Sequence, residues 1–124
     1  MKQRVLVIDD DRLVADTLNL IFQANGYDSE AVYSAADGLA RARTFAPGLL
    51  LCDVTMPEET GIQLAEKIQQ EMPNCKLLML TAYASNNLKV EQYISRTNQP
   101  LRLLHKPCRP EILLREAENL LQTA

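Results

Sequence analysis

Short apolar runs alternate along the chain with longer segments of helical periodicity. Three of the runs, residues 5–8, 49–52 and 76–80, consist almost entirely of Val, Leu, Ile and similar side chains. Runs of this length and composition are typical of strands that are buried on both faces of a sheet. The segments 29–33 and 101–105 are less uniformly apolar, so they predict a weaker strand and an edge strand.

The intervening segments place apolar side chains three and four positions apart, as one face of an α-helix does. Their ends carry residues that commonly begin or stop a helix, with Ser34 and Ser85 as caps, Gly26 as a stop and Pro110 as a first helical residue. These signals predict helices over residues 12–25, 34–46, 61–72, 85–95 and 110–121.

Strands and helices therefore alternate from one end of the chain to the other, without a linker or a longer repeat. This order predicts an α/β protein with a parallel sheet, right-handed crossovers and helices on both faces. We expect a flavodoxin-like, doubly wound (βα)5 sandwich of three layers around a five-stranded parallel sheet, in one domain over residues 1–124.

The composition agrees with a packed globular domain. The 124 residues are 47% hydrophobic and 23% charged, which fits a single domain and argues against a disordered or fibrous chain. No apolar run approaches the roughly 18–20 residues that a membrane helix needs. Acidic residues cut short the run behind Lys2 and Arg4, so no signal peptide is expected. We expect a soluble protein of the cytoplasm with no role at membranes.

The charges and the cysteines narrow the classes of function. Residues 1–62 carry five basic and ten acidic side chains, whereas residues 86–124 carry six and four. The second balance is too weakly basic for a nucleic-acid surface, so no direct contact with nucleic acid is expected. Three cysteines without a Cys-x-x-Cys pair do not fit a disulfide framework or a zinc site, and we expect buried or half-buried thiols.

Polar side chains follow the predicted strands at the points where four of them end. Asp9 and Asp10 follow the first strand, and Asp53, Thr81 and Lys106 follow three later ones. Ligands of open parallel sheets bind beyond the carboxyl ends of the strands. We therefore expect these side chains to meet at one edge of the sheet, although they are almost a hundred positions apart in the sequence.

Each of these residues alone has an ordinary structural explanation, since an Asp after a strand is often only a helix cap. Their combination points to chemistry. Crowded carboxylates repel one another, which a stable surface avoids unless a cation compensates. Mg²⁺ suits such oxygen ligands together with phosphate oxygens, and a nearby ammonium and hydroxyl would bind a phosphoryl group.

These residues resemble those of the receiver domain of two-component response regulators, over essentially the whole chain. The apolar strand with its acidic pair, Asp9 and Asp10, is similar to the family's first strand. The segment 53–61, DVTMPEETG, matches the family's D-x-x-M-P-x-x-x-G stretch. Thr81 and the Lys-Pro pair at 106–107 match the ends of its fourth and fifth strands. Each motif alone is weak, but all of them in this order are specific.

The resemblance implies that the protein is a phosphoacceptor switch of two-component signalling and not a metabolic enzyme, although it would catalyse its own phosphorylation and dephosphorylation. Asp53 would be the phosphoacceptor, and its carboxylate would attack the phosphohistidine of a sensor histidine kinase or a phosphotransfer protein. Lys106 would pair with one phosphoryl oxygen, and the Thr81 hydroxyl would hydrogen-bond another.

The resemblance also implies a magnesium cofactor at the same place. Asp10 and Asp53 would bind Mg²⁺ directly, joined by the backbone carbonyl of Thr55. Asp9 would act mainly through bound water.

One position departs from the family pattern. Relatives carry an aromatic side chain three positions before the lysine, which swings inward on phosphorylation, and here that position is Leu103. We expect Leu103 to pack against the sheet, and switching to depend on the loop after Thr81 and on the helix at 85–95.

In relatives the fourth helix, fifth strand and fifth helix form the partner surface, which implies a downstream protein target and a homodimer through this face.

Two other interpretations stay open. A small Mg²⁺-dependent phosphatase of the haloacid dehalogenase type also uses a strand-end Asp, but it requires Asp-x-Asp, and here Thr55 stands two positions after Asp53. A receiver-like scaffold that works without phosphorylation would be favoured by the loss of an acid or of the lysine, and all are present. The sequence does not say whether the chain acts alone or belongs to a longer regulator.

Overall fold

The computed structural model describes residues 2–54, 61–81, 101–106 and 108–122. Along the chain the elements are β1 (Arg4–Ile8), α1 (Arg12–Ala24), β2 (Asp28–Val32), α2 (Ala35–Phe45), β3 (Leu49–Asp53), α3 (Gly61–Glu71), β4 (Lys76–Thr81), β5 (Leu101–His105) and α5 (Pro110–Leu121). Every predicted element that falls on described residues is present, with each end within one residue of the prediction. The helix predicted over 85–95, the loop after Thr81 and Thr55 lie outside the described residues.

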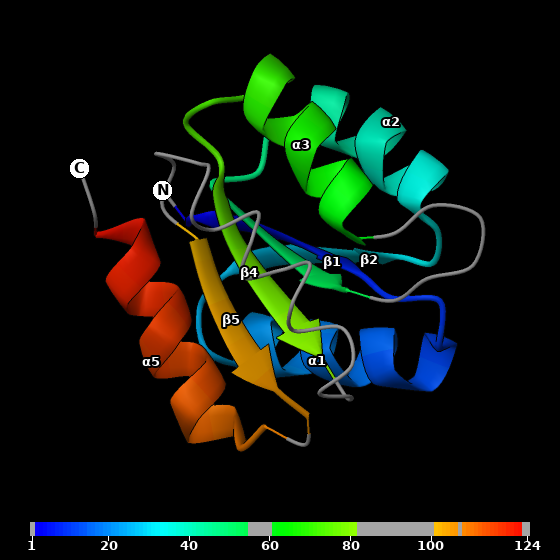
Figure 1. Ribbon diagram of the computed structural model, residues 1–124. Helices are drawn as coiled ribbons and strands as arrows, with labels where there is room; N and C mark the ends of the chain where they lie inside the picture. The colour runs from blue at the N-terminus through cyan, green and yellow to red at the C-terminus, as the bar shows by residue number, and fades with distance from the viewer. Residues whose placement is uncertain (1, 55–60, 82–100, 107, 123–124) are drawn as a thin grey trace.

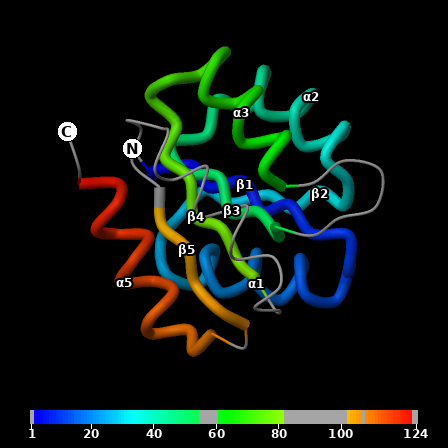
Figure 2. Tube along the Cα trace, in the orientation of Figure 1, coloured from blue at the N-terminus to red at the C-terminus, as the bar shows by residue number. Residues whose placement is uncertain are grey.

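The strands form one five-stranded parallel sheet in the order β2-β1-β3-β4-β5. Helices α1 and α5 cover one face of this sheet, and α2 and α3 cover the other (Figure 1). The Cα tube shows the same three layers, with the strands between the two pairs of helices (Figure 2). The predicted flavodoxin-like, doubly wound sandwich is thus confirmed, and β5 lies at an edge of the sheet as predicted.

The apolar runs form strands because both faces of the sheet are covered. Successive strand residues point to opposite faces. On β3, Leu50 and Cys52 belong to the core on the α2–α3 side, whereas Leu49 and Leu51 belong to the core on the α1–α5 side. All four side chains are at most 2% exposed. A strand in this position has no face on which a polar side chain would be solvated, which explains the unbroken run.

Local side-chain chemistry sets where the helices begin. The Asp11 carboxylate accepts hydrogen bonds from the N–H groups of Leu13 and Val14, so Asp11 is the cap of α1. Ser34 caps α2 by accepting from the N–H of Asp37 at 3.1 Å. Helix α5 begins at Pro110 without a side-chain cap, because Arg109 at the capping position has no acceptor oxygen in its side chain.

Helix α2 ends one residue before the predicted limit of 46, and the cause lies in the next residue. Ala46 adopts the left-handed conformation with φ 53° and ψ 60°. Proline disfavours the α conformation of the residue before it, and Pro47 occupies that following position. The Arg4 guanidinium donates to the Ala46 carbonyl at 3.2 Å and helps hold this turn.

The cysteines behave as the sequence predicted. Cys52 and Cys75 are buried and Cys108 is half-buried, and no disulfide joins them. Within the described part of the chain, no helix has the length and apolarity to cross a membrane.

Because Cys75 is buried, the stability of the protein should depend on pH in the alkaline range. Burial raises the pKa of this thiol to about 12, so the unfolded chain loses the proton at a lower pH than the folded protein does. The stabilising contribution is complete below about pH 9 and is lost as the pH rises towards 12. Between pH 8 and 10, the free energy of unfolding in urea should fall by about 1 kcal/mol more for the parent than for Cys75→Ala. An identical pH dependence in the two proteins would contradict this account.

Candidate functional site

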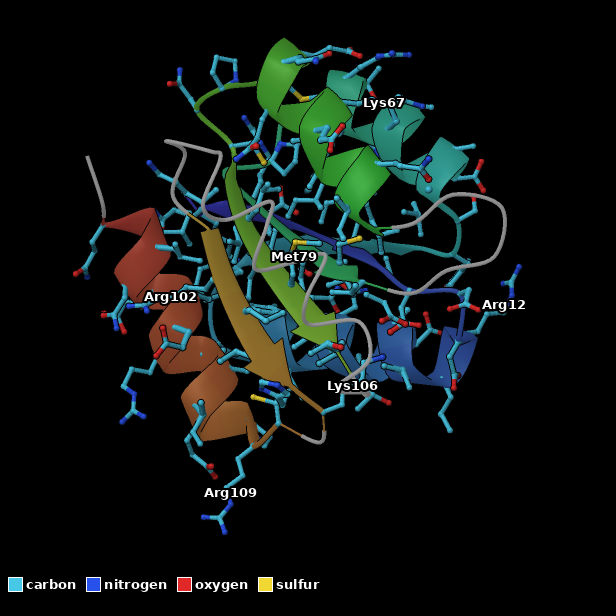
Figure 3. All side chains as sticks on the ribbon, in the orientation of Figure 1. Arg12, Lys67, Met79, Arg102, Lys106 and Arg109 are labelled. Atoms are coloured by element: carbon cyan, nitrogen blue, oxygen red, sulfur yellow. The ribbon has the colours of Figure 1, made fainter. Side chains whose placement is uncertain are left out.

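The register of the sheet brings the carboxyl ends of four strands to one edge. Ile8 of β1 pairs with Cys52 of β3, and the following residue, Asp53, pairs with Leu80 of β4. Thr81 pairs with His105 of β5. The polar residues that follow these pairs therefore lie along one edge, and Figure 3 shows Lys106 there, at the end of β5.

Main-chain hydrogen bonds continue past the strands and fix this edge. The Lys106 N–H donates to the Thr81 carbonyl at 2.8 Å, and the Val54 N–H donates to the Leu80 carbonyl at 2.8 Å. On the other side, the Asp9 N–H donates to the Val32 carbonyl at 3.2 Å. These hydrogen bonds thus link the backbone segments of the site residues to the adjacent strands.

Three carboxylates meet at this edge, and we call Asp9, Asp10 and Asp53 the acidic cluster. One carboxylate oxygen from each lies within 4.8 Å of the others. Asp9 is buried and only 2% exposed, Asp53 is half-buried and Asp10 is exposed. The Asp11 N–H donates to Oδ1 of Asp9 at 3.0 Å and orients this buried carboxylate.

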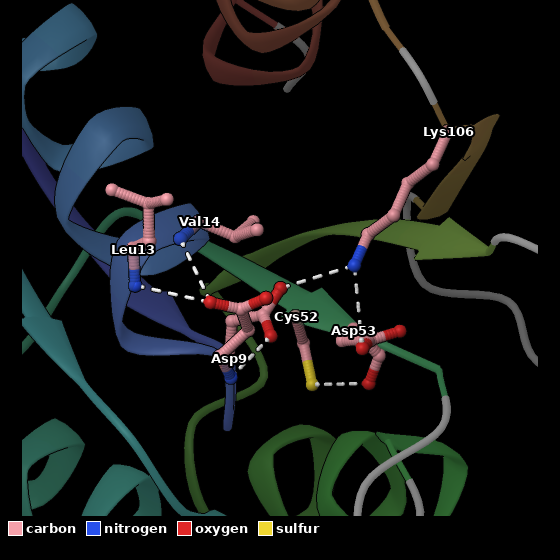
Figure 4. Close-up of polar contacts among 7 residues, drawn as sticks. Asp9, Leu13, Val14, Cys52, Asp53 and Lys106 are labelled. Carbon is pink, nitrogen blue, oxygen red and sulfur yellow. Dashed lines mark hydrogen bonds and ion pairs between the residues drawn. The ribbon is translucent and has the colours of Figure 1, made fainter.

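Lys106 lies between two members of the acidic cluster. Its Nζ is 3.1 Å from Oδ2 of Asp9 and 3.3 Å from Oδ2 of Asp53, as Figure 4 shows. Burial lowers the pKa of the Lys106 ammonium, but the charges and hydrogen bonds of Asp53 and Asp9 outweigh burial and raise it above its ordinary value. Lys106 therefore stays charged throughout the physiological range.

The charges at this edge do not balance. Among the residues that the structure describes at this edge, three carboxylates face one ammonium, which leaves a formal excess of two negative charges. Mg²⁺ takes oxygen ligands at about 2.0–2.1 Å in an octahedron, so ligand oxygens lie up to about 4.2 Å apart. The 4.8 Å spread of the acidic cluster is close to this range, and its donors are all carboxylate oxygens. The residues present therefore fit a hard divalent cation.

Other residues singled out from the sequence have clear positions. Thr81 is completely buried at the end of β4. Leu103 is partly buried and packs against the core on the α2–α3 side, as expected. His105, the last residue of β5, is exposed. Thr55 lies outside the described residues.

Two features of the site were not assigned from the sequence. The Cys52 thiol donates to the carbonyl oxygen of Asp53 at 3.2 Å. Gly61, the first residue of α3, donates its N–H to the Val54 carbonyl at 2.8 Å, directly after β3. The glycine that closes the 53–61 motif was the available signal, but its contact with the strand depends on how α3 packs.

Comparison with known proteins agrees with this geometry. The sequence profile of the response regulator receiver domain matches residues 5–118, and the chain belongs to this family. The transcriptional regulatory protein ZraR of Salmonella typhimurium is 36% identical over 87 residues, which are 70% of this chain and 20% of ZraR. The DNA-binding response regulator MtrA of Mycobacterium tuberculosis is 30% identical over 82 residues, which are 66% of this chain and 36% of MtrA. The chain thus spans only a fifth to about a third of these curated relatives.

Solved structures show the same fold. A CheY-like response regulator receiver domain protein from Methanospirillum hungatei has a TM-score of 0.87 and 28% identity, with 98% of this chain and 94% of that chain covered. The receiver domain of Francisella response regulator 1452 has a TM-score of 0.82 and 26% identity, with 98% of both chains covered. The chain is therefore a receiver domain of two-component signalling, and its acidic cluster is consistent with the magnesium site of such domains.

Because the described carboxylates repel one another, Asp10→Asn should stabilise the protein when no divalent ion is present. Because Asp10 is exposed, the change removes one crowded carboxylate without disturbing the core. In the absence of divalent ions, the thermal midpoint should rise by roughly 2 °C or more, and the further rise that MgCl₂ gives the parent should be lost.

The matched control is Asp28→Asn, which removes an exposed carboxylate at the opposite end of the sheet, where Asp28 pairs with Arg4. This variant should keep the full response to MgCl₂. If Asp10→Asn responded to MgCl₂ as the parent does, Asp10 would not belong to the cation site.

Proposed function

We propose that Asp53 accepts a phosphoryl group from the phosphohistidine of a sensor histidine kinase or phosphotransfer protein, in a Mg²⁺-dependent reaction that alters contacts with other proteins. The observation that carries the proposal is the meeting of the Lys106 ammonium with Asp53 and the buried Asp9. These residues come from three strands and have no structural need to meet. We further propose that residues 1–124 act as one receiver domain.

The transfer is a displacement at phosphorus. An Asp53 carboxylate oxygen attacks the phosphorus, the new O–P bond forms and the P–N bond to the donor imidazole breaks. The donor phosphoimidazole carries a proton on its other ring nitrogen, so the imidazole that leaves with the electron pair of the broken bond is a neutral ring. The half-buried Asp53 is exposed enough to be reached, since its side chain is 13% accessible, whereas Asp9 at 2% is not.

Lys106 has a role both before and after transfer. Before transfer, its ammonium holds the Asp53 carboxylate by an ion pair at 3.3 Å. After transfer, Asp53 no longer carries its own negative charge and the phosphoryl oxygens do, so the ammonium pairs with one of these oxygens. The Lys106 N–H donates to the Thr81 carbonyl, and this link between the two residues supports the Thr81 hydroxyl as the donor to a second phosphoryl oxygen.

The acidic cluster would hold Mg²⁺ beside the acceptor. Asp10 and Asp53 would bind it directly with the Thr55 carbonyl, and Asp9 through water. When bound, the ion supplies positive charge to the phosphoryl oxygens. Asp9 and Asp10 would still offer two carboxylates to the ion once Asp53 is an acyl phosphate.

The packing of Leu103 indicates which part of the domain would transmit phosphorylation to partner proteins. Leu103 is packed against the core on the α2–α3 side, so this position offers no aromatic ring that could swing between two states. We propose that phosphorylation is read through the residues after Thr81, with the β5 and α5 surface as the contact for a downstream protein or a second copy. An ion pair of 3.1 Å between Arg102 and Glu116 crosses that surface.

The acceptor assignment predicts the behaviour of Asp53→Asn. The parent, incubated with MgCl₂ and phosphoramidate, should gain the mass of one base-labile phosphoryl group in intact-protein mass spectrometry. Asp53→Asn should gain none, because an amide is too weak a nucleophile to attack phosphorus. The control Asp28→Asn should be phosphorylated as the parent is. Equal phosphorylation of Asp53→Asn would move the acceptor to another residue.

A further inference from the structure

Helix α3 touches the main chain of the acceptor with no side chain between them. A Cβ built on Gly61 would overlap the carbonyl oxygen of Asp53, and it would lie 3.0 Å from Cα of Val54 and 3.1 Å from the carbonyl carbon of Asp53. Each of these atoms belongs to the backbone, so no flexible side chain could turn away to make room.

Position 61 requires glycine because there is no room for a Cβ, and not because its backbone conformation favours glycine. Gly26 has a φ of 91°, in the left-handed region that favours glycine, whereas Gly61 is not among the described residues with positive φ. Any L-residue could adopt the backbone of Gly61. The glycine is needed there because the acceptor strand is too close for a Cβ.

Neither side of this contact can retreat easily. The acceptor strand lies in the middle of the sheet, between β1 and β4, and Val54 is held to Leu80 at 2.8 Å. Helix α3 is fixed by the fully buried Leu64 and Ile68. At its other end, Glu71 accepts two hydrogen bonds from the Arg43 guanidinium, at 2.8 and 2.9 Å.

We propose that Gly61 is a positioning residue for the acceptor: by letting α3 start directly against the backbone of Asp53, it sets the distance between the Asp53 carboxylate and Lys106. The inference rests on the proposed function, to which it adds a residue that touches neither donor nor metal. Ordinary contact for a Cβ begins at 3.4 Å, so a methyl group at position 61 requires a displacement near the acceptor. A misplacement of about 1 Å costs up to about a hundredfold in the rate of an oriented reaction.

The chain provides a matched control at Gly38 in α2. A Cβ there would also overlap a neighbour, but that neighbour is Cδ1 of Ile8, the far end of a flexible side chain. Gly38→Ala therefore introduces the same methyl group under a similar crowding, on the same face of the sheet, and leaves the backbone of Asp53 untouched.

The test compares Gly61→Ala with Gly38→Ala and the parent by two measurements. The first is the rate of phosphorylation by phosphoramidate at saturating MgCl₂, in which the Asp53 oxygen forms the bond to phosphorus and ammonia leaves. The maximal rate of Gly61→Ala should fall at least about tenfold. The donor concentration for half-maximal rate should stay within about twofold, because the donor still reaches the site. Gly38→Ala should keep both values within about twofold of the parent.

The second measurement is independent of phosphorylation. In ¹H–¹⁵N NMR spectra, Gly61→Ala should shift the amide signals of Asp53, Val54 and Lys106, whereas Gly38→Ala should leave the Lys106 signal in place. A parent that takes no phosphoryl group would refute the proposed function, while the spectra would still decide the role of Gly61.

Three results would overturn the proposal. The first is an equal loss of rate in both variants, and the second is an unchanged Lys106 signal in Gly61→Ala. The third is a Gly61→Ala protein that stays unfolded, even with trimethylamine N-oxide to favour the folded state, while Gly38→Ala folds. That result would make Gly61 a requirement for folding and not for positioning.

Discussion

One ammonium group lies between two carboxylates at the end of the sheet, and its single charge does not balance the charges around it. Lys106 neutralises part of the field of Asp9 and Asp53, which raises its own pKa and keeps it protonated. Asp10 adds a third carboxylate within 4.8 Å. Repulsion among these carboxylates favours the binding of further positive charge at this edge. The chemistry of the site thus follows from an electrostatic imbalance that the fold maintains.

The fold maintains this charge imbalance by covering both faces of a parallel sheet. The buried central strands β1, β3 and β4 carry no charge along their length, and their charged residues lie at the strand ends. Main-chain hydrogen bonds from Lys106 to Thr81 and from Val54 to Leu80 then fix these ends relative to one another. On the α2–α3 side, Gly61 lets the first turn of α3 reach the backbone of Asp53. Core packing and site geometry are therefore two consequences of the same arrangement of strands.

Some features of this site can be predicted from patterns along the chain, whereas others depend on how distant segments pack. The strands and the meeting of Asp53 with Lys106 were predictable, because apolar runs mark buried strands and parallel strands end at one edge. Asp11 follows two other aspartates, and only its hydrogen bonds to the helix identify it as the cap of α1. The left-handed Ala46 and the tight contact of Gly61 were not predicted. The first has a signal in the sequence, because Pro47 disfavours the α conformation of Ala46. The second depends on distances of tenths of an ångström between packed segments, which no pattern along the chain records.

The most direct test of the charge imbalance is where a divalent cation binds. Mn²⁺ accepts the same oxygen ligands as Mg²⁺, and its paramagnetism broadens the NMR signals of nearby amides. Substoichiometric Mn²⁺ added to ¹⁵N-labelled protein should first remove the amide signals of Asp10, Val54 and Lys106, and excess Mg²⁺ should restore them. Loss of the Gly26 and Gly48 signals instead, or uniform broadening of all signals, would contradict the account.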